Sequence, residues 1–461
     1  MRELIHRISD RLISPDVREI DTADGRLTLW GLFVPLFIEQ LLMNLMGTVN
    51  TLVLSHYSDA AVAAVGSANQ VISLFYTVFS VVSGGASVVI SHRLGAKDEK
   101  AAGDASFTAV VTGFSVSLLC GLLFSMAAAP LMRMLNLEGD VLRMARQYFR
   151  ICISFAFLQG TMSACSATLR SYGRPRVAVT ASILMNALNA VLNLMVIRLP
   201  EAVPLHGVSG IAAANVISRA TALTVMLVYM ARCDLPLHFA SKRLSALRSL
   251  KNILRIGVPA GISTLSYSLS QVVSTSILGL LGQTAISAKI YISTIVFYVY
   301  VIGYSLGLTV SIMIGWMSGA GDFDRAAKLN REALKVAVGL NMLFSAVIWL
   351  FGRPLVGFFT KDPAILAMVP GILAIDFFVE IGRGFNHIEE NSLRGAGDAV
   401  FPMAVSVISC WGISILFSWL LGIRAGFGLY GCWIAFMLDE LFRGINDWRR
   451  FRSGKWRKIK V

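Results

Sequence analysis

The stretch IYISTIVFYVYVIGYSLGLTVSIMIGW at Ile290–Trp316 decides the fold class, because it contains no charged side chain over its whole length. A helix that crosses the hydrocarbon core of a bilayer needs about 20 predominantly apolar residues. Similar uncharged runs occur at Val71–Ile90, Thr108–Leu131 and Ile262–Leu281. The chain shows no series of segments with the alternation over about ten residues that is typical of membrane-spanning strands. The pattern therefore predicts an all-α membrane protein.

The composition of the whole chain agrees with this prediction. Of its 461 residues, 56% are hydrophobic and 15% are charged, whereas soluble domains carry about 25% charged residues. A soluble core stops growing near about 300 residues and could not bury such an excess. We therefore expect lipid to cover much of the surface. The six cysteines have no CxxC spacing and indicate packing positions, not a disulfide or zinc framework.

The positive charge is distributed unevenly along the chain, whose formal net charge is +14. Lys and Arg concentrate in alternate loops, which is the positive-inside pattern of helical membrane proteins. The pattern predicts a multi-pass protein with both termini in the cytoplasm, and it disfavours nucleic acid as a partner. The first 26 residues are too polar for a cleavable signal peptide.

Hydropathy predicts twelve transmembrane helices. We expect them near residues 28–55, 61–92, 104–131, 141–169, 176–198, 208–231, 253–280, 285–316, 326–351, 364–392, 400–423 and 428–447. The expected domains are a cytoplasmic N-terminal segment (1–27), an N-lobe (28–231), a cytoplasmic linker (232–252), a C-lobe (253–447) and a basic cytoplasmic tail (448–461).

An internal repeat relates the two halves. An offset of 224 residues takes Val34-Pro35 to Val258-Pro259, and it takes the Gly-Ala-x-Asp segment at 95–98 to the one at 319–322. Because six helices precede the second copy, the two copies run parallel. Parallel repeats related by an axis along the membrane normal are typical of alternating-access transporters. The Gly-Ala-x-Asp segments themselves predict tight turns that cap the following helix.

Several motifs in this order resemble the multidrug and toxic compound extrusion (MATE) family, of NorM and DinF type. They are PLFIEQ at 35–40, AVAAVG at 61–66, LRGAGD at 393–398 and GLYGCWIA at 428–435. The resemblance covers nearly the whole chain. It implies twelve transmembrane helices in two pseudo-symmetric six-helix lobes that form a V around a central cavity. It further implies a monomeric protein of the bacterial inner membrane. Such a protein exports organic cations or amphipathic compounds in exchange for H⁺ or Na⁺.

Ion coupling requires a carboxylate inside the membrane, where a charge costs about 2.5–3.5 kcal/mol or more. Glu380, Arg383 and Asn386 recur at helical spacing on one face of the tenth predicted helix, and Asp376 lies one turn earlier. Glu39 is the corresponding candidate in the first helix. We predict Glu380, Glu39, Asp376 and Arg383 as coupling residues. The alternative for Glu380 with Arg383 is a static ion pair, and the alternative for Glu39 is a partly exposed residue that bonds Gln40 or the lobe interface. For Asp439 and Glu440 in the twelfth helix we expect interfacial salt bridges.

The N-lobe departs from the family pattern, in which many bacterial members carry aspartates late in the first helix and in the fifth. Here Asn50 and Asn193 stand at those positions, and asparagine does not titrate, although its amide oxygen can ligate Na⁺. Further polar groups are predicted to line a cavity, with interhelical hydrogen bonding as the alternative. Together the candidates are Asn50, Asn69, Gln70, Asn186, Asn189, Asn193, Tyr267, Gln271, Asn386 and Trp411.

The function expected is secondary active multidrug efflux without enzymatic activity, with lipid bilayer and small molecules as partners. No cofactor and no metal centre are expected besides the coupling ion, H⁺ or Na⁺. One alternative is a lipid-linked saccharide flippase of the same superfamily, which would need a more cationic cavity than Arg219, Lys289 and Arg383 provide. Others are a lipid-modifying membrane enzyme and a membrane scaffold without transport. The coupling ion, the substrate and the lobe that couples remain open at this level.

Overall fold

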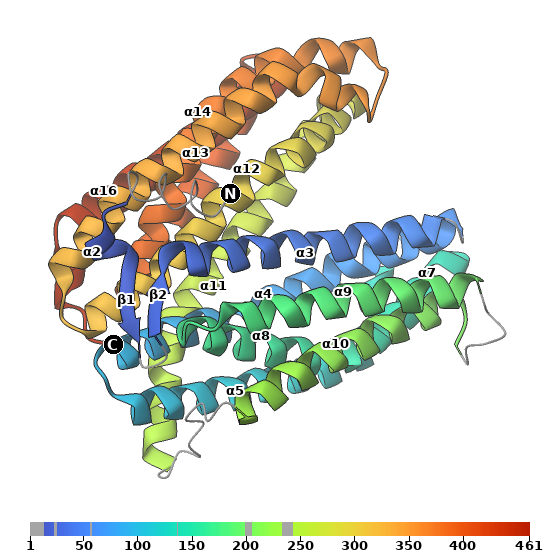
Figure 1. Cartoon of the computed structure of the whole chain (residues 1–461). Helices are drawn as coiled ribbons and strands as arrows, with labels where there is room; N and C mark the ends of the chain where they lie inside the picture. The colour runs from blue at the N-terminus through green and yellow to red at the C-terminus, as the bar shows by residue number, and fades with distance from the viewer. Residues whose placement is uncertain (1–12, 23–24, 56–57, 136, 199–204, 233–242) are drawn as a thin grey trace. The chain divides into compact units, whose positions relative to one another are not determined.

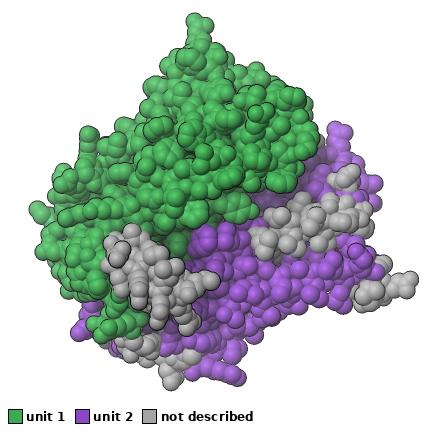
Figure 2. Space-filling view, turned by 45° about the horizontal axis from the view of Figure 1, so that its top comes forward, with its two compact units in different colours: residues 1–33, 262–461 green, residues 34–261 purple. Residues whose placement is uncertain are grey.

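A computed structural model describes residues 13–22, 25–55, 58–135, 137–198, 205–232 and 243–461. Two compact units make up the chain (Figure 2), and we describe each by itself. Unit 1 contains residues 1–33 and 262–461, and unit 2 contains residues 34–261. Apart from one short hairpin, the described residues form helices and their connections.

The first part of the chain forms six predicted spans (Figure 1). Its helices are α3 (Leu29–Ser55), α4 (Asp59–Gly95), α5 (Glu99–Met126), α6 (Ala128–Arg133), α7 (Gly139–Ser154), α8 (Ala156–Ser171), α9 (Pro175–Arg198) and α10 (Gly207–Arg232). The fourth span is broken at Phe155, where α7 and α8 meet at 47°. The third ends at Ala127, and α6 follows with Pro130 in its first turn, where the missing N–H is tolerated.

The second part forms the other six spans. Its helices are α11 (Arg243–Gly279), α12 (Gln283–Gly319), α13 (Phe323–Gly357), α14 (Pro363–Gly395), α15 (Val400–Ser409), η2 (Cys410–Ile415), η3 (Ser418–Arg424), α16 (Gly428–Arg452) and η4 (Lys455–Lys458). The eleventh span comprises α15, η2 and η3, and much of it is π-helical.

These helices confirm the predicted fold class. In the described part of the chain, eight are long and apolar enough to cross a membrane, and the α7–α8 pair makes a ninth. The remaining three predicted spans coincide with α3, α11 and α16, which are helical over their predicted lengths. Six spans precede residues 233–242 and six follow them.

The unit boundaries differ from the predicted domains. The sequence assigned residues 232–252 to a linker. Of these, residues 243–252 form the first turns of α11, and Arg232 is the last residue of α10. Residues 233–242 lie outside the described residues. No Gly or Pro interrupts residues 243–256, so helix formation extends through them. The first part of α11 belongs to unit 2 because it packs against α4, and the chain therefore divides within α11.

The N-terminal segment is more ordered than the sequence suggested. Helix α2 (Pro15–Arg18) leads into an antiparallel hairpin of β1 (Glu19–Thr22) and β2 (Gly25–Thr28). The Lys328 ammonium lies 2.8 Å from the Asp16 carboxylate and lowers the pKa of this exposed group. Ser14 donates to Glu332, with its backbone N–H 2.7 Å from Oε2. These contacts attach the segment to the start of α13, which explains why residues 1–33 belong to unit 1.

The repeated turns cap the following helices as predicted. Asp98 accepts a hydrogen bond from the Ala101 N–H at 3.0 Å, and Asp322 accepts one from the Arg325 N–H at 3.2 Å. The preceding residue has a left-handed backbone in both copies, with φ 58° at Lys97 and φ 78° at Gly321. The duplicated motif is therefore a structural turn.

Glycines set the distance between α4 and α11. A Cβ at Gly257 would lie 2.0 Å from the Val81 carbonyl oxygen, and one at Gly85 would lie 2.1 Å from the Ile253 carbonyl oxygen. Backbones approach this closely where small residues remove the side chain, as in membrane helix pairs generally. The neighbouring Gly84 has open space around its Cβ position.

We expect Gly257→Ala to destabilise unit 2, because its methyl group would overlap a backbone oxygen that cannot rotate away. Overpacking of this kind costs about 1–3 kcal/mol. The melting temperature of the purified protein measures the effect, with Gly84→Ala as the matched control on α4. Equal melting temperatures for Gly257→Ala and the parent protein would contradict the close approach.

Candidate functional site

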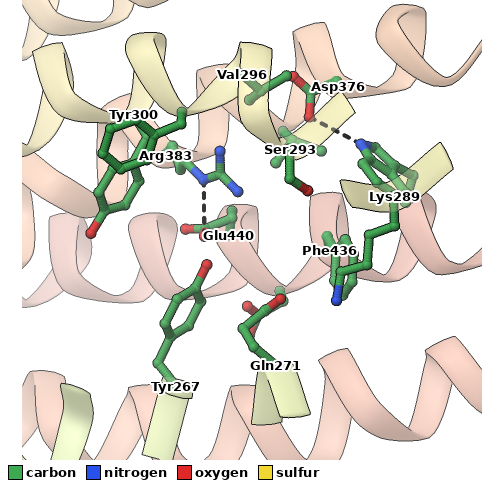
Figure 3. A pocket seen from close by; sticks show the side chains of 14 residues that line it. Tyr267, Gln271, Lys289, Ser293, Val296, Tyr300, Asp376, Arg383, Phe436 and Glu440 are labelled. Atoms are coloured by element: carbon green, nitrogen blue, oxygen red, sulfur yellow. Dashed lines mark hydrogen bonds and ion pairs between the residues drawn. The ribbon is translucent and has the colours of Figure 1, made fainter. Parts of the chain in front are cut away.

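A pocket in unit 1 collects polar and aromatic side chains from four helices. Its volume is about 240 Å³. The lining residues are Tyr267, Gln271, Lys289, Ser293, Val296, Phe297, Tyr300, Asp376, Val379, Arg383, Trp433, Phe436, Asp439 and Glu440. Helix α11 contributes the first two, α12 the next five, α14 the next three and α16 the rest. Figure 3 shows Tyr267 directing its hydroxyl toward Glu440 and Lys289 extending beside Phe436.

Arg383 links carboxylates from two helices at this pocket. Its guanidinium contacts Glu380, one turn earlier on α14, and its Nε lies 3.5 Å from Glu440 Oε1 on α16. Glu380 is fully buried and also accepts from Asn341 Nδ2 of α13 at 3.3 Å. Glu440 accepts from Asn386 Nδ2 at 2.8 Å. A single arginine thus connects two acids that belong to different helices.

A second arginine, Arg443, lies one turn after Glu440 on α16. Arg443 Nη2 lies 2.8 Å from Asp439 Oδ2 and 2.8 Å from Glu440 Oε1. Glu440 therefore has an arginine on α14 and another on its own helix. The three side chains are at most 5% exposed, so their charges interact strongly in a region of low dielectric constant.

Aromatic rings surround these charges. The Arg383 guanidinium lies 5.7 Å from the Tyr300 ring centroid, and that of Arg443 lies 5.4 Å from the Tyr267 centroid. Trp433 donates its indole N–H to Asp376 Oδ1 at 3.0 Å. Rings at these distances attract cations through their faces. The pocket therefore combines carboxylates with aromatic faces that contact its own arginines.

Carboxylates outnumber cationic side chains at this site. Asp376, Glu380, Asp439 and Glu440 face Arg383, Arg443 and Lys289 within or directly behind the lining. Lys289 lies near the start of α12, where its Nζ donates to Thr275 Oγ1 at 2.7 Å. With every group ionised, the set carries one negative charge in excess. A bound H⁺ or another cation would neutralise it.

The structure brings together most of the C-lobe residues predicted from the sequence. Asp376, Arg383, Tyr267 and Gln271 line the pocket, while Glu380 and Asn386 bond to lining residues or their partners. Trp411 is not among the lining residues. It is 44% exposed and donates to Ser266 Oγ at 2.9 Å.

The predicted residues of the N-lobe form a separate set in unit 2. Glu39 accepts from Ser166 Oγ at 2.8 Å and from Arg170 Nη1 at 3.0 Å, so both its oxygens have partners. This buried ion pair differs from the alternative stated for Glu39, which was a partly exposed residue bonded to Gln40 or the lobe interface. Asn186 donates to Ser182 O of its own helix, and Gln70 is exposed. Asn50 lies in α3, and for this residue the structure describes only the backbone.

A buried hydrogen-bonded chain joins the remaining N-lobe amides. Asn193 donates to Asn189 at 3.0 Å, and Asn189 donates to Asn215 at 2.9 Å. Asn215 donates to the Tyr148 hydroxyl at 2.9 Å, and this hydroxyl donates to Asn69 at 3.2 Å. The chain connects α4, α7, α9 and α10. It contains no carboxylate among the described residues that form these bonds.

Sequence reasoning gave too little weight to Glu440 and did not select Arg443, Trp433 or Asn215. One signal was present, because Glu380 and Arg383 are spaced like Glu440 and Arg443 on the other helix. The salt bridges expected for Asp439 and Glu440 are present, with Arg443 and Arg383 as partners, and both acids also line the pocket.

Comparison with known proteins gives consistent matches over nearly the whole chain. The family profile described as MatE matches residues 35–195 and 259–420. An uncharacterized transporter, YisQ of Bacillus subtilis, is 35% identical over 94% of this chain and 96% of its own length. A probable multidrug resistance protein NorM of Thermotoga maritima is 27% identical over 95% and 94% of the two chains.

Solved structures show the same fold at low sequence identity. A crystal structure described as MATE in complex with MaD3S has a TM-score of 0.85 and 21% identity, covering 94% of this chain and 96% of that chain. A MOP superfamily transporter from Pyrococcus furiosus has a TM-score of 0.84 and 20% identity over the same shares. The two segments that the MatE profile matches correspond to the two halves of the internal repeat. The chain therefore belongs to the MatE family of multidrug and toxic compound extrusion transporters.

Proposed function

We propose that this chain is a secondary active exporter that exchanges cationic or amphipathic compounds for a coupling ion, with H⁺ as the favoured ion. The observation that carries the proposal is the position of Arg383 between Glu380 and Glu440 beside an aromatic pocket. A carboxylate in this position has two competing partners, the guanidinium and an incoming cation.

The exchange follows from this competition. A proton on Glu380 or Glu440 removes one negative charge and weakens the hold of that side chain on Arg383. An organic cation in the pocket instead interacts favourably with the ionised carboxylates and with the rings of Tyr300 and Trp433. Because each ligand favours a different charge state, binding of one promotes release of the other.

The pocket dimensions suit one part of a drug-sized compound. Its volume of about 240 Å³ is below the roughly 300–1,000 Å³ typical of complete ligand sites. We infer that it receives the cationic or aromatic end of the compound. The observation supports amphipathic compounds over small inorganic substrates.

The arrangement of the charges favours H⁺ over Na⁺. Na⁺ requires several oxygen atoms that converge on one point, whereas Arg383 and Arg443 lie between the carboxylates and would repel a metal cation there. A proton needs only one carboxylate oxygen. One proton per cycle supplies about 1.4 kcal/mol per pH unit, which sustains roughly a tenfold concentration ratio.

The placement of both chain ends supports a common side for the termini. Asp16 of the N-terminal segment pairs with Lys328, and Arg457 of the C-terminal segment lies 3.0 Å from Asp324 on the same helix. Together with the positive-inside pattern, these contacts favour a cytoplasmic location for both ends in a bacterial inner membrane. We expect a monomer to be sufficient for transport.

The alternatives fit the pocket less well. A flippase for pyrophosphate-linked saccharides needs an excess of cationic side chains, but acids outnumber Lys and Arg at this site. A lipid-modifying enzyme needs a nucleophile activated by a base, and among the described residues no hydrogen bond joins a lining hydroxyl to a lining carboxylate.

We expect Glu380→Gln to abolish coupling while leaving binding of an organic cation measurable, since glutamine keeps the shape of the side chain but does not exchange a proton. The assay is uptake of rhodamine B methyl ester into proteoliposomes under an imposed pH gradient. The parent protein should reach about a tenfold ratio per pH unit for one coupled proton, and the variant a ratio near one. The same vesicles with a Na⁺ gradient test the other ion. A variant that still follows the pH gradient would rule out Glu380 as the coupling carboxylate.

Glu39→Gln provides the contrasting prediction. Its carboxylate has full partners in Arg170 and Ser166, so loss of the charge should lower stability without changing the coupling ratio. Breaking a buried pair costs about 3–5 kcal/mol, measured here as a lower melting temperature. Loss of pH-driven uptake by well-folded Glu39→Gln protein would transfer the coupling role to unit 2.

A further inference from the structure

Arg219 is an unusual charge within unit 2. It lies halfway along α10, a helix apolar enough to span the membrane. An arginine near the middle of a span is costly and is normally neutralised by a partner or used for function. The partners of Arg219 therefore decide what the residue does.

Five other arginines of the membrane helices have carboxylate partners among the described residues. The pairs are Arg170 with Glu39, Arg383 with Glu380 and Glu440, Arg394 with Glu390, Arg443 with Asp439 and Glu440, and Arg450 with Asp398. Arg219 differs from all of them. The ionisable groups that act on it are Tyr76, Tyr148 and Cys152, with no carboxylate of the described residues among them.

The contacts of Arg219 hold it in place without neutralising it. Its Nε donates to Gln159 Oε1 at 3.1 Å, and its guanidinium lies 5.2 Å from the Tyr76 ring centroid. Gln159 is itself buried and its amide lies 3.4 Å from Ser163 Oγ. The guanidinium also forms a side-chain hydrogen bond with Tyr76. No carboxylate of the described residues contacts its terminal nitrogens, and the residue is only partly buried. A guanidinium presented in this way binds carboxylates through two parallel hydrogen bonds.

We propose that Arg219 binds an anionic group, such as a carboxylate, on a transported compound. The hydroxyls of Tyr76 and Tyr148 provide neutral polar groups beside it. A lipid phosphate is a poor occupant, because head groups lie about 15 Å from the centre of a hydrocarbon core about 30 Å thick. The inference rests on the proposed export function and names the residue that would hold the acidic group of a zwitterionic compound.

Rhodamine B and its methyl ester form a matched pair of probes, because they differ only in whether the carboxyl group is free. Binding of each dye to the purified full-length protein is measured by fluorescence polarisation. We expect Arg219→Gln to weaken binding of rhodamine B by about tenfold or more, as expected for loss of a hydrogen bond to a charged group. Binding of the methyl ester should change less than about twofold.

Two further variants separate binding from folding. Arg219→Lys keeps the charge and should retain part of the preference for the free carboxylate. Arg232→Gln removes an exposed arginine at the end of the same helix and should bind both dyes as the parent does. Melting temperatures of all variants report on folding.

The outcomes distinguish the anion site at Arg219 from the proposed export function on which it rests. If Arg219→Gln weakens both dyes equally, or lowers only the melting temperature, the arginine has a structural role and the anion site is refuted. If the parent binds the methyl ester but not rhodamine B, the anion site is also refuted while export of cations stands. If the parent binds neither dye, both the anion site and the proposed multidrug function fail.

Discussion

A charged side chain inside a bilayer needs a neutralising neighbour, and in unit 1 this requirement is met between α14 and α16. Arg383 on α14 contacts Glu380 of its own helix and Glu440 of α16, while Arg443 lies beside Glu440 from the other side. Removing one partner would leave an uncompensated charge in a region of low dielectric constant. The two helices must therefore keep their register for the pocket to exist.

The backbone provides the short distance that these ion pairs require. A Cβ at Gly382 would lie 2.9 Å from the Leu441 nitrogen, and one at Gly444 would lie 2.7 Å from Phe385 Cβ. Small residues at this crossing let α14 and α16 approach closely, so that Arg383 and Asn386 of α14 reach Glu440 of α16. Close packing and charge compensation thus support each other at the same interface.

The two units use different polar chemistry although the sequence repeats. Unit 1 places carboxylates and arginines at its pocket, and unit 2 contains the amide and hydroxyl chain from Asn193 to Asn69. An amide chain binds and orders its neighbours without exchanging protons. This contrast favours unit 1 for ion coupling and leaves Arg219 of unit 2 as a candidate contact for the transported compound.

The sequence by itself determined the all-α membrane fold, the positions of the twelve spans and the family, because each depends on local apolar runs or on motif order. It also selected Glu380, Arg383 and Asp376, whose spacing on one helix is visible in the chain. Only the tertiary structure showed that Glu440 and Arg443 join them, that Glu39 is paired with Arg170, and that Arg219 has neutral neighbours. These relations depend on which helix faces which. Glu39 and Arg170, for example, are 131 positions apart in the chain and meet through packing that hydropathy does not encode.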